Sequence, residues 1–241
     1  MRAPLPRAFL LDLDETILDD SGNLAQCWRE ACTAHRSEMD GLDPAVVLDA
    51  IERTAQWYWD DPERHRVGRL DLLAARCEVA RLALAGIGTD VPGLAEKIGG
   101  TYAARRDATI QPFADAVETV RWLRERGCRL ALLTNGNGAA QRRKVDRFNL
   151  AELFDLILIE GEVGCGKPDP RIYQHALDQM RVAASDAWMA GDNLEWDVAQ
   201  PQRMGIFGIW IDVHGTGVPP GLGVRPDRVV RRLSDLRDAA P

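Results

Sequence analysis

The sequence lacks long apolar runs, and it is poor in several residue types that mark particular classes of protein. No stretch approaches the ~18 uninterrupted apolar residues that a membrane span requires. The N-terminal apolar run over residues 8–11 ends at Asp12, so it is too short and too soon charged for a secretory signal. The pattern therefore predicts a protein that neither crosses a membrane nor enters the secretory route.

Cysteine and histidine are scarce and widely spaced. The five cysteines form no C-x-x-C pair, and their odd number leaves at least one of them unpaired. The four histidines complete no cluster with zinc-ligand spacing. This composition favours a cytoplasmic protein with reduced thiols and without a zinc site.

Positive charge is also in deficit. Lys and Arg total 30 against 37 for Asp and Glu, which gives a net charge of −7 with neutral histidines. Nucleic-acid backbones and anionic membrane surfaces repel such a chain, so we expect neither as a partner. A small phosphorylated metabolite remains compatible, because a pocket can be locally positive. The composition does not distinguish a monomer from a homodimer.

Short apolar runs alternate with helical segments in most of the chain. Such runs are typical of strands that are buried on both faces of a parallel sheet. They cover residues 8–13, 129–134, 155–159, 187–190 and 206–211, with helical periodicity over 114–126, 139–148 and 170–180. The alternation predicts an α/β fold with an open, doubly wound parallel sheet of Rossmann-like type.

Residues 20–106 interrupt this alternation. No strand-like run occurs there, and Pro62 marks one of the turns between helical patterns. The helical patterns lie near residues 24–38, 44–60, 70–86 and 92–106. We therefore expect residues 1–19 and 107–241 to form the α/β core domain, with residues 20–106 as a helical domain inserted after the first strand.

Two acidic residues follow the first predicted strand. Asp12 and Asp14 are two positions apart, so their side chains point to the same face of an extended chain. Neighbouring carboxylates repel each other unless a cation or a shared proton relieves them. A polar strand end without a function explains this pair equally well.

Three further motifs favour a functional interpretation. LLTNG at 132–136 ends a strand with a hydroxyl and an amide, and GKPDP at 166–170 places a lysine before a helix. GDNLEWD at 191–197 ends a strand with Asp192, and Asp197 follows five residues on. Ligands bind at the carboxyl ends of the strands in open α/β sheets, so these motifs predict one site. Lys167 is one of only three lysines beside 27 arginines, which indicates a need for a compact point charge.

These motifs, together with DLDET at 12–16, resemble the four motifs of the haloacid dehalogenase-like (HAD) hydrolase superfamily. The helical insertion looks like the C1-type cap of that superfamily. The stretch from Thr134 to Tyr173, which includes Gln141 and Lys144, is similar to the phosphatase branch that contains N-acylneuraminate-9-phosphatase and pyrimidine 5′-nucleotidases. The motifs are specific for the superfamily and not for a substrate.

The resemblance implies a Mg²⁺-dependent phosphatase that hydrolyses a small phosphate monoester, of the nucleotide or sugar phosphate class, through an aspartyl-phosphate. Asp12 would be the nucleophile, Asp14 the general acid and base, and Lys167 the third catalytic residue. The other implied roles are phosphate binding by Thr134, Asn135 and Lys167, Mg²⁺ binding by Asp12, Asp14 and Asp192, and support from Asp197 and Asn193 behind these residues.

Other activities within the superfamily stay open. Related 2-haloacid dehalogenases lack an acid at the position of Asp14, because a leaving halide needs no proton, so Asp14 argues against dehalogenation. Mutase relatives keep both acids, which leaves a β-phosphoglucomutase-like activity open. A non-catalytic HAD-like protein that binds phosphate ligands is a further alternative.

Two segments outside the motifs have a distinctive composition. Residues 56–61 (QWYWDD) bring aromatic side chains that either pack between helices or stack on a ligand. The basic residues of 64–69 favour a solvated face over an anion site. Arg142, Arg143 and Lys144 are likewise predicted to form a solvated helix face.

Overall fold

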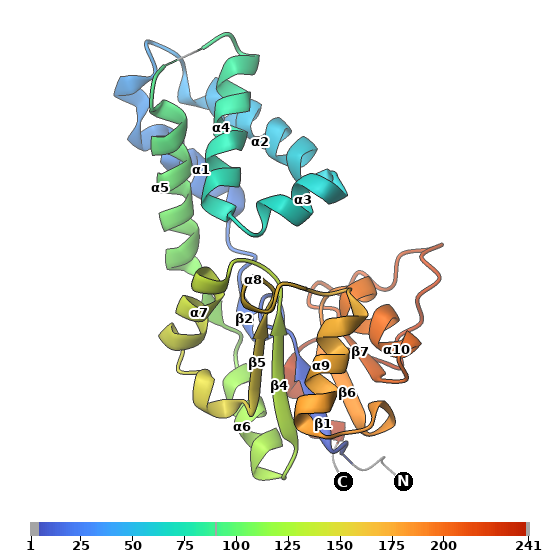
Figure 1. Cartoon of the computed structure of the whole chain (residues 1–241). Coiled ribbons are helices and arrows are strands. Elements are labelled where there is room, and N and C mark those ends of the chain that lie inside the picture. Colours follow the sequence, from blue (N-terminus) through green and yellow to red (C-terminus); the bar gives the residue numbers. More distant parts are fainter. Residues whose placement is uncertain (1–4, 90, 240–241) are drawn as a thin grey trace. The chain divides into compact units, whose positions relative to one another are not determined.

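A computed structural model describes residues 5–89 and 91–239. The backbone divides into two units, one formed by Met1–Asp19 with Gln111–Pro241 and the other by Asp20–Ile110 (Figure 1). Residues 1–4, 90 and 240–241, which fall in the domains expected from the sequence, lie outside the described residues. No helix of the described chain has both the length and the apolar character that a membrane crossing needs.

The first unit is built on a six-stranded sheet of order β5-β4-β1-β6-β7-β8, in which every pair of neighbours is parallel. This arrangement confirms the expected doubly wound α/β fold. The strands are β1 (Ala8–Leu11), β4 (Arg129–Thr134), β5 (Leu156–Ile159), β6 (Ala187–Gly191), β7 (Phe207–Ile211) and β8 (Arg228–Val230). Strand β8, an edge strand of three residues, was not predicted from the sequence.

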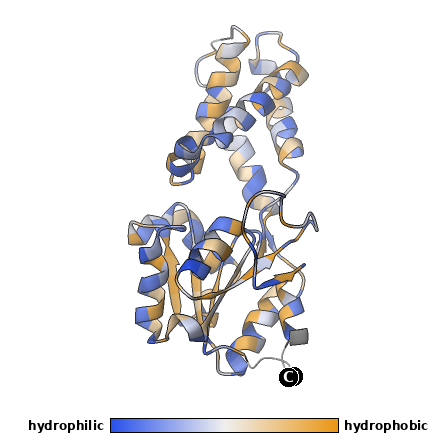
Figure 2. Cartoon of the chain, turned by 90° about the vertical axis from the view of Figure 1, so that its right-hand side faces the viewer, coloured by the Kyte–Doolittle hydropathy of each residue, from blue (hydrophilic) through white to orange (hydrophobic). Residues whose placement is uncertain are grey.

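Helices cover both faces of the sheet, which explains why β1 contains no polar residue. Leu10 packs on one face in a cluster with Ile172 and Tyr173 of α9 (Pro170–Met180), while Phe9 and Leu11, which point to the other face, are also fully buried. In Figure 2 the strands are orange and the helices carry both colours. The other helices of this unit are α6 (Ala116–Glu125), α7 (Gly138–Arg147), α8 (Glu160–Val163) and α10 (Gln200–Arg203).

The register of the sheet brings the predicted motifs to one edge. Leu11 of β1 is level with Leu132 of β4 and with Ala190 of β6. Because the three strands are parallel, the residues that follow them emerge on the same side of the sheet. Beside this edge, β2 (Leu18–Asp19) pairs antiparallel with β3 (Gln111–Pro112), the segments before and after the helical unit.

The second unit is helical and has its own apolar core. Its buried residues include Trp28, Ile51, Leu84 and Ile98. Its helices are α1 (Leu24–Ala34), α2 (Pro44–Asp60), α3 (Pro62–Gly68), α4 (Leu72–Gly86) and α5 (Leu94–Thr109).

Helix α3 was not predicted from the sequence. Asp61 caps it by accepting a hydrogen bond from the backbone N–H of Arg64, and Pro62 occupies the first turn. Proline is favoured there because the first turn needs no backbone donor. Pro62 was predicted to mark a turn, although a capping aspartate directly before a proline is also a signal for the start of a helix.

Candidate active site

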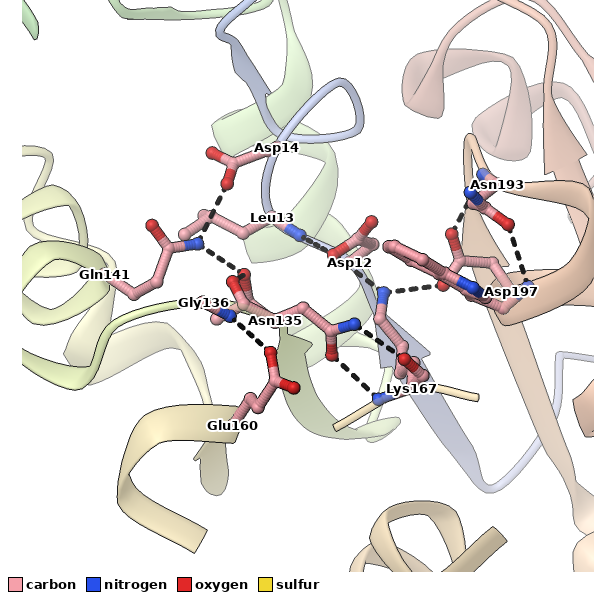
Figure 3. A network of polar contacts seen from close by, with 12 residues as sticks. Asp12, Leu13, Asp14, Asn135, Gly136, Gln141, Glu160, Lys167, Asn193 and Asp197 are labelled. Atoms are coloured by element: carbon pink, nitrogen blue, oxygen red, sulfur yellow. Dashed lines mark hydrogen bonds and ion pairs between the residues drawn. The ribbon is translucent and has the colours of Figure 1, made fainter. Parts of the chain in front are cut away.

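Asp12 follows β1 and lies in a largely closed environment. Its side chain is 11% exposed, and its backbone N–H donates to the carbonyl of Ala190 at the end of β6. The Oδ1 atom accepts a hydrogen bond from the backbone N–H of Leu13 at 2.8 Å and lies 2.8 Å from the Nζ atom of Lys167 (Figure 3). The Oδ2 atom accepts no hydrogen bond from the residues that the structure describes.

Lys167 connects two of the predicted acids. Its side chain is 1% exposed, and its Nζ atom lies 2.6 Å from Oδ1 of the fully buried Asp197 as well as against Asp12. Burial by itself would lower the pKa of Lys167, but the two carboxylates outweigh it and raise the pKa. The ammonium group is therefore a fixed positive charge in the site.

Asn135 fixes the loop that presents Lys167. Its Nδ2 atom donates to the carbonyl of Lys167, and its Oδ1 atom accepts from the backbone N–H of Lys167, both at 2.7 Å. A Cβ atom on Gly166 would come within 2.6 Å of Asn135 Oδ1, so the close contact between Asn135 and this loop requires glycine at position 166. The side chain predicted to bind phosphate thus supports the lysine.

The motif after β6 contributes a second acidic group. One carboxylate oxygen each of Asp12, Asp192 and Asp197 lie within 4.8 Å of one another. The Oδ2 atom of Asp197 accepts from the backbone N–H of Asn193 at 3.0 Å. A Cβ atom on Gly191 would be 2.3 Å from the Asp197 carboxylate, so a larger residue would displace that group.

Asn193 serves the local backbone. Its Oδ1 atom accepts hydrogen bonds from the backbone N–H groups of Glu195 and Trp196. These bonds cap the helical turns over Leu194–Ala199, and this segment carries Asp197 toward Lys167. Asn193 therefore holds its motif in shape.

The charges of this group do not balance. Three carboxylates face one ammonium, and burial raises the pKa of Asp12 to about 6 against the opposing effect of Lys167. Burial, followed by the carboxylates of Asp12 and Asp197, raises the pKa of Asp192 to about 8. Throughout the described chain no group donates a hydrogen bond to the Asp192 carboxylate.

This donor set fits a hard divalent cation. Mg²⁺ prefers oxygen ligands and is usually held by one or two carboxylates. Asp12 Oδ2 and the Asp192 carboxylate accept nothing from the described residues, whereas both oxygens of Asp197 are occupied by Lys167 and Asn193. Asp12 and Asp192 are thus the carboxylates that fit the ion, with Asp197 behind them.

Asp14 belongs to a neighbouring series of hydrogen-bonded side chains and not to the buried group of Asp12, Lys167, Asp192 and Asp197. Its Oδ1 atom lies 2.8 Å from Nζ of Lys144, and its Oδ2 atom accepts from Nε2 of Gln141 at 2.8 Å. The same Nε2 atom donates to the hydroxyl of Thr134 at 2.6 Å. Gln141 therefore joins Asp14 to the end of β4 (Figure 3).

The prediction of a solvated face at residues 142–144 is wrong for Lys144. This side chain is only 10% exposed because α7 turns it toward Asp14, whereas Arg142 binds Glu162 near the surface. Gln141, Lys144 and Val145 form the buried side of α7. The signal in the sequence was that Gln141 and Lys144 occupy positions on the same side of the helix as the apolar Val145.

Glu160 is a further site residue that sequence reasoning missed. It follows β5, is 8% exposed, and accepts a hydrogen bond from the backbone N–H of Gly136 at 2.9 Å. Gly136 has a φ of 116°, a conformation that favours glycine. The contact fixes the turn that follows Thr134. The signal in the sequence was an acid at the end of an apolar run.

Comparisons with known proteins agree with this geometry. The haloacid dehalogenase-like hydrolase family matches residues 6–205. A phosphoserine phosphatase of Thermus thermophilus is 34% identical, over 96% of this chain and 97% of that protein. An N-acylneuraminate-9-phosphatase of Rattus norvegicus is 28% identical, over 95% and 92% of the two chains.

Solved structures give the same superfamily. The crystal structure of a 2-haloacid dehalogenase from Pseudomonas syringae pv. Tomato superposes with a TM-score of 0.64 at 25% identity, and the match covers 98% of both chains. This chain therefore belongs to the haloacid dehalogenase-like hydrolases and is an enzyme of the hydrolase class.

Proposed function

We propose that this protein is a Mg²⁺-dependent phosphatase that hydrolyses a small phosphate monoester, of the nucleotide or sugar phosphate class, through an aspartyl-phosphate on Asp12. The observation that carries the proposal is the Asp12 carboxylate, which is paired with the buried Lys167. It lies beside Asp192, whose carboxylate accepts no hydrogen bond from the described residues and has a raised pKa. The similarity to two proteins named as phosphatases supports a phosphate ester as the substrate.

In the first half of the reaction, a carboxylate oxygen of Asp12 attacks the phosphorus atom, and the bond to the leaving oxygen breaks. Asp14 gives its proton to that oxygen, so that an alcohol leaves. Lys167 and the hydroxyl of Thr134 bind the oxygens of the transferring group, assisted by the backbone N–H groups near Leu13 and Asn135.

In the second half, Asp14 takes a proton from water, and the water oxygen attacks the phosphorus. The bond between phosphorus and Asp12 then breaks, which restores the Asp12 carboxylate and releases inorganic phosphate. Asp197 positions Lys167 in both halves, since the two groups are 2.6 Å apart.

Mg²⁺ would be held by the carboxylates of Asp12 and Asp192 and by the backbone carbonyl of Asp14. When bound, it offsets the repulsion between the Asp12 carboxylate and the phosphate dianion. The raised pKa values of Asp12 and Asp192 support this assignment, because they reflect buried carboxylates without enough positive charge.

The remaining assignments belong to the same proposal. The helical unit, inserted between β2 and β3, acts as the cap that selects the substrate. The five cysteines are all free, which agrees with a cytoplasmic protein. The protein acts alone or as a homodimer on a soluble phosphorylated metabolite.

The test is phosphate release from an aryl phosphate and from a panel of nucleotides and sugar phosphates, with Mg²⁺ and with a chelator. Metal-dependent release that is absent from Asp12→Asn supports the proposal. Asp146→Asn is the matched control, because Asp146 is exposed on α7. A folded wild-type protein that releases no phosphate from any substrate contradicts it.

Dehalogenation is the second candidate, because a 2-haloacid dehalogenase shares the fold over nearly the whole chain. Asp14 argues against it, since halide release needs no proton donor. Halide release from 2-chloropropionate without Mg²⁺, and no phosphate release, would decide for the dehalogenase.

A further inference from the structure

The helical unit contains a cavity of its own. Its volume is about 460 Å³, within the range of small-molecule sites, and every lining residue belongs to Asp20–Ile110. Helices α1 to α5 all contribute to the lining. Residues 64–69, predicted as a solvated face, are divided by the structure, because His65 and Arg69 line the cavity.

Aromatic rings form one part of the wall. The rings of Trp28 and Tyr102 stack with centroids 3.6 Å apart and an angle of 10°, and both residues are buried. Trp59 lies in the lining as well, with its ring edge-on to His65. These surfaces favour a ligand with an apolar or planar part.

Arg76 brings a positive charge to this apolar wall. Its guanidinium lies over the ring of Tyr102, 5.3 Å from the centroid. Within the described chain Arg76 donates no hydrogen bond and forms no ion pair. Burial lowers the pKa of Arg76, as expected for a cation removed from water.

A neighbouring arginine shows what Arg76 lacks. Arg106 also lines the cavity, and it binds both the carboxylate of Asp20 at 2.6 Å and the carbonyl of the same residue. Partly buried charges are normally paired, because an unpaired charge loses hydration at a cost of roughly several kcal/mol. The cavity lining contains two acids, Asp20 and Glu52. Asp20 binds Arg106, and Glu52 is exposed and forms no ion pair with Arg76 in the described chain, so the guanidinium of Arg76 can bind an external anion.

We propose that this cavity binds a small organic acid, with its carboxylate on the guanidinium of Arg76 and its apolar part against Trp28, Trp59 and Tyr102. The planar fork of a guanidinium matches a carboxylate through two parallel hydrogen bonds. One unpaired arginine balances a monoanion and not a phosphate dianion. This binding does not depend on the phosphatase proposal, because no residue of the cavity belongs to the α/β unit.

The test is calorimetric titration of the whole protein with phenylacetate and phenylpropionate, beside their uncharged amides. We expect saturable binding of the acids, at least about tenfold tighter than that of the amides, since hydrogen bonds to charged groups contribute more than neutral ones. Arg76→Met should weaken acid binding by about tenfold or more and leave amide binding unchanged.

Two variants keep the experiment decisive. Arg81→Met removes an exposed arginine of the same helix that is paired with Glu78, and it should bind the acids as the wild type does. Arg76→Lys keeps the charge without the fork and should give an intermediate affinity. Arg76→Met loses no hydrogen bond to the described residues, and the methionine can keep an apolar contact with Tyr102, so its melting temperature should change little.

Several results would overturn the proposal. It fails if the acids do not bind at millimolar concentration, if the amides bind as well as the acids, or if Arg76→Met binds the acids normally. Inorganic phosphate that competes as strongly as the acids would also overturn it, because the cavity would then be a general anion site.

Discussion

The polar edge of the α/β sheet and the cavity of the helical unit have opposite charge imbalances. At the sheet edge, Asp12, Asp192 and Asp197 face a single ammonium, that of Lys167, and the pKa of Asp192 is raised to about 8. In the cavity, Arg76 is a guanidinium without a carboxylate partner among the described residues.

The difference indicates what each region is built to receive. Both regions withdraw charges from water, and a folded chain keeps such charges only where a partner compensates them. The sheet edge is short of positive charge and fits a cation, whereas the cavity is short of negative charge and fits an anion. The sign of the missing charge is thus a guide to the ligand.

The largest expected effect separates the two regions outright. Asp12→Asn should reduce phosphate release by about 10³-fold or more, because an amide cannot form the phosphoenzyme. The same variant should bind phenylpropionate in the cavity as tightly as the wild type. Parallel phosphatase and calorimetric measurements check both statements, and a loss of cavity binding would show that the regions are not independent.

Removing the single cation should destabilise the sheet edge. Lys167→Met leaves three carboxylates together, and breaking such buried pairs costs about 3–5 kcal/mol of unfolding free energy. Urea denaturation measures the loss, and added Mg²⁺ should recover part of it. Lys97→Met is the control, because Lys97 is 53% exposed and its loss should change stability by less than about 0.5 kcal/mol. If Lys167→Met and Lys97→Met were equally stable, the proposed excess of negative charge at the sheet edge would be contradicted.

A smaller effect comes from relieving the acidic excess. The pKa of Asp192 is raised from 3.8 to about 8, so the folded state binds the extra proton and stability falls as pH rises between these values. In chelator at about pH 8, Asp192→Asn should be more stable than the wild type by on the order of 1–3 kcal/mol. At about pH 4 the two proteins should be nearly equal.

Magnesium should reverse this order. Added Mg²⁺ is expected to stabilise the wild type, since the cation replaces the proton on Asp192, and to leave the stability of Asp192→Asn largely unchanged. Urea denaturation with and without Mg²⁺ measures both effects. A wild type whose stability in chelator does not fall toward pH 8 would contradict the raised pKa of Asp192.

The smallest expected effect concerns the polar contacts that hold the side chain of Asp14. Lys144→Met removes the 2.8 Å contact that holds this carboxylate. Turnover of an alkyl phosphate should fall roughly tenfold, because its leaving group needs a positioned proton donor, and turnover of an aryl phosphate should change little. Arg143→Met, an exposed neighbour on α7, is the control. Equal losses on both esters would show that Lys144 does not act through Asp14.

The fold, and the gathering of the candidate site residues at one edge of the sheet, were predictable from the sequence. The apolar run over 129–134 and the helix over 170–180 have the predicted bounds. Ligand sites lie at the carboxyl ends of the strands in open α/β sheets, so the sequence predicts that Asp12, Lys167 and Asp192 lie together. Local pattern and sheet geometry suffice for these statements.

The contacts within the candidate site could not be predicted from the sequence pattern alone. Lys144 is 130 positions from Asp14, and only the rotation of α7 about its axis turns it inward rather than toward solvent. Asn135 was expected to help to bind phosphate, and the sequence did not indicate that its side-chain amide would also hold the backbone of Lys167. Nothing in the flanking residues distinguishes these alternatives.

The sequence by itself therefore determined the α/β class, the helical insertion and the chemical types at the sheet edge, because these follow from periodicity and from the residue order along each strand. The tertiary structure alone decided which charges are buried and which are paired. The sequence offers 27 arginines, and only the packing of α4 on α5 shows that Arg76 lies over Tyr102 and forms no ion pair within the described chain. Charge pairing joins distant elements, so it is a property of their packing and not of local sequence.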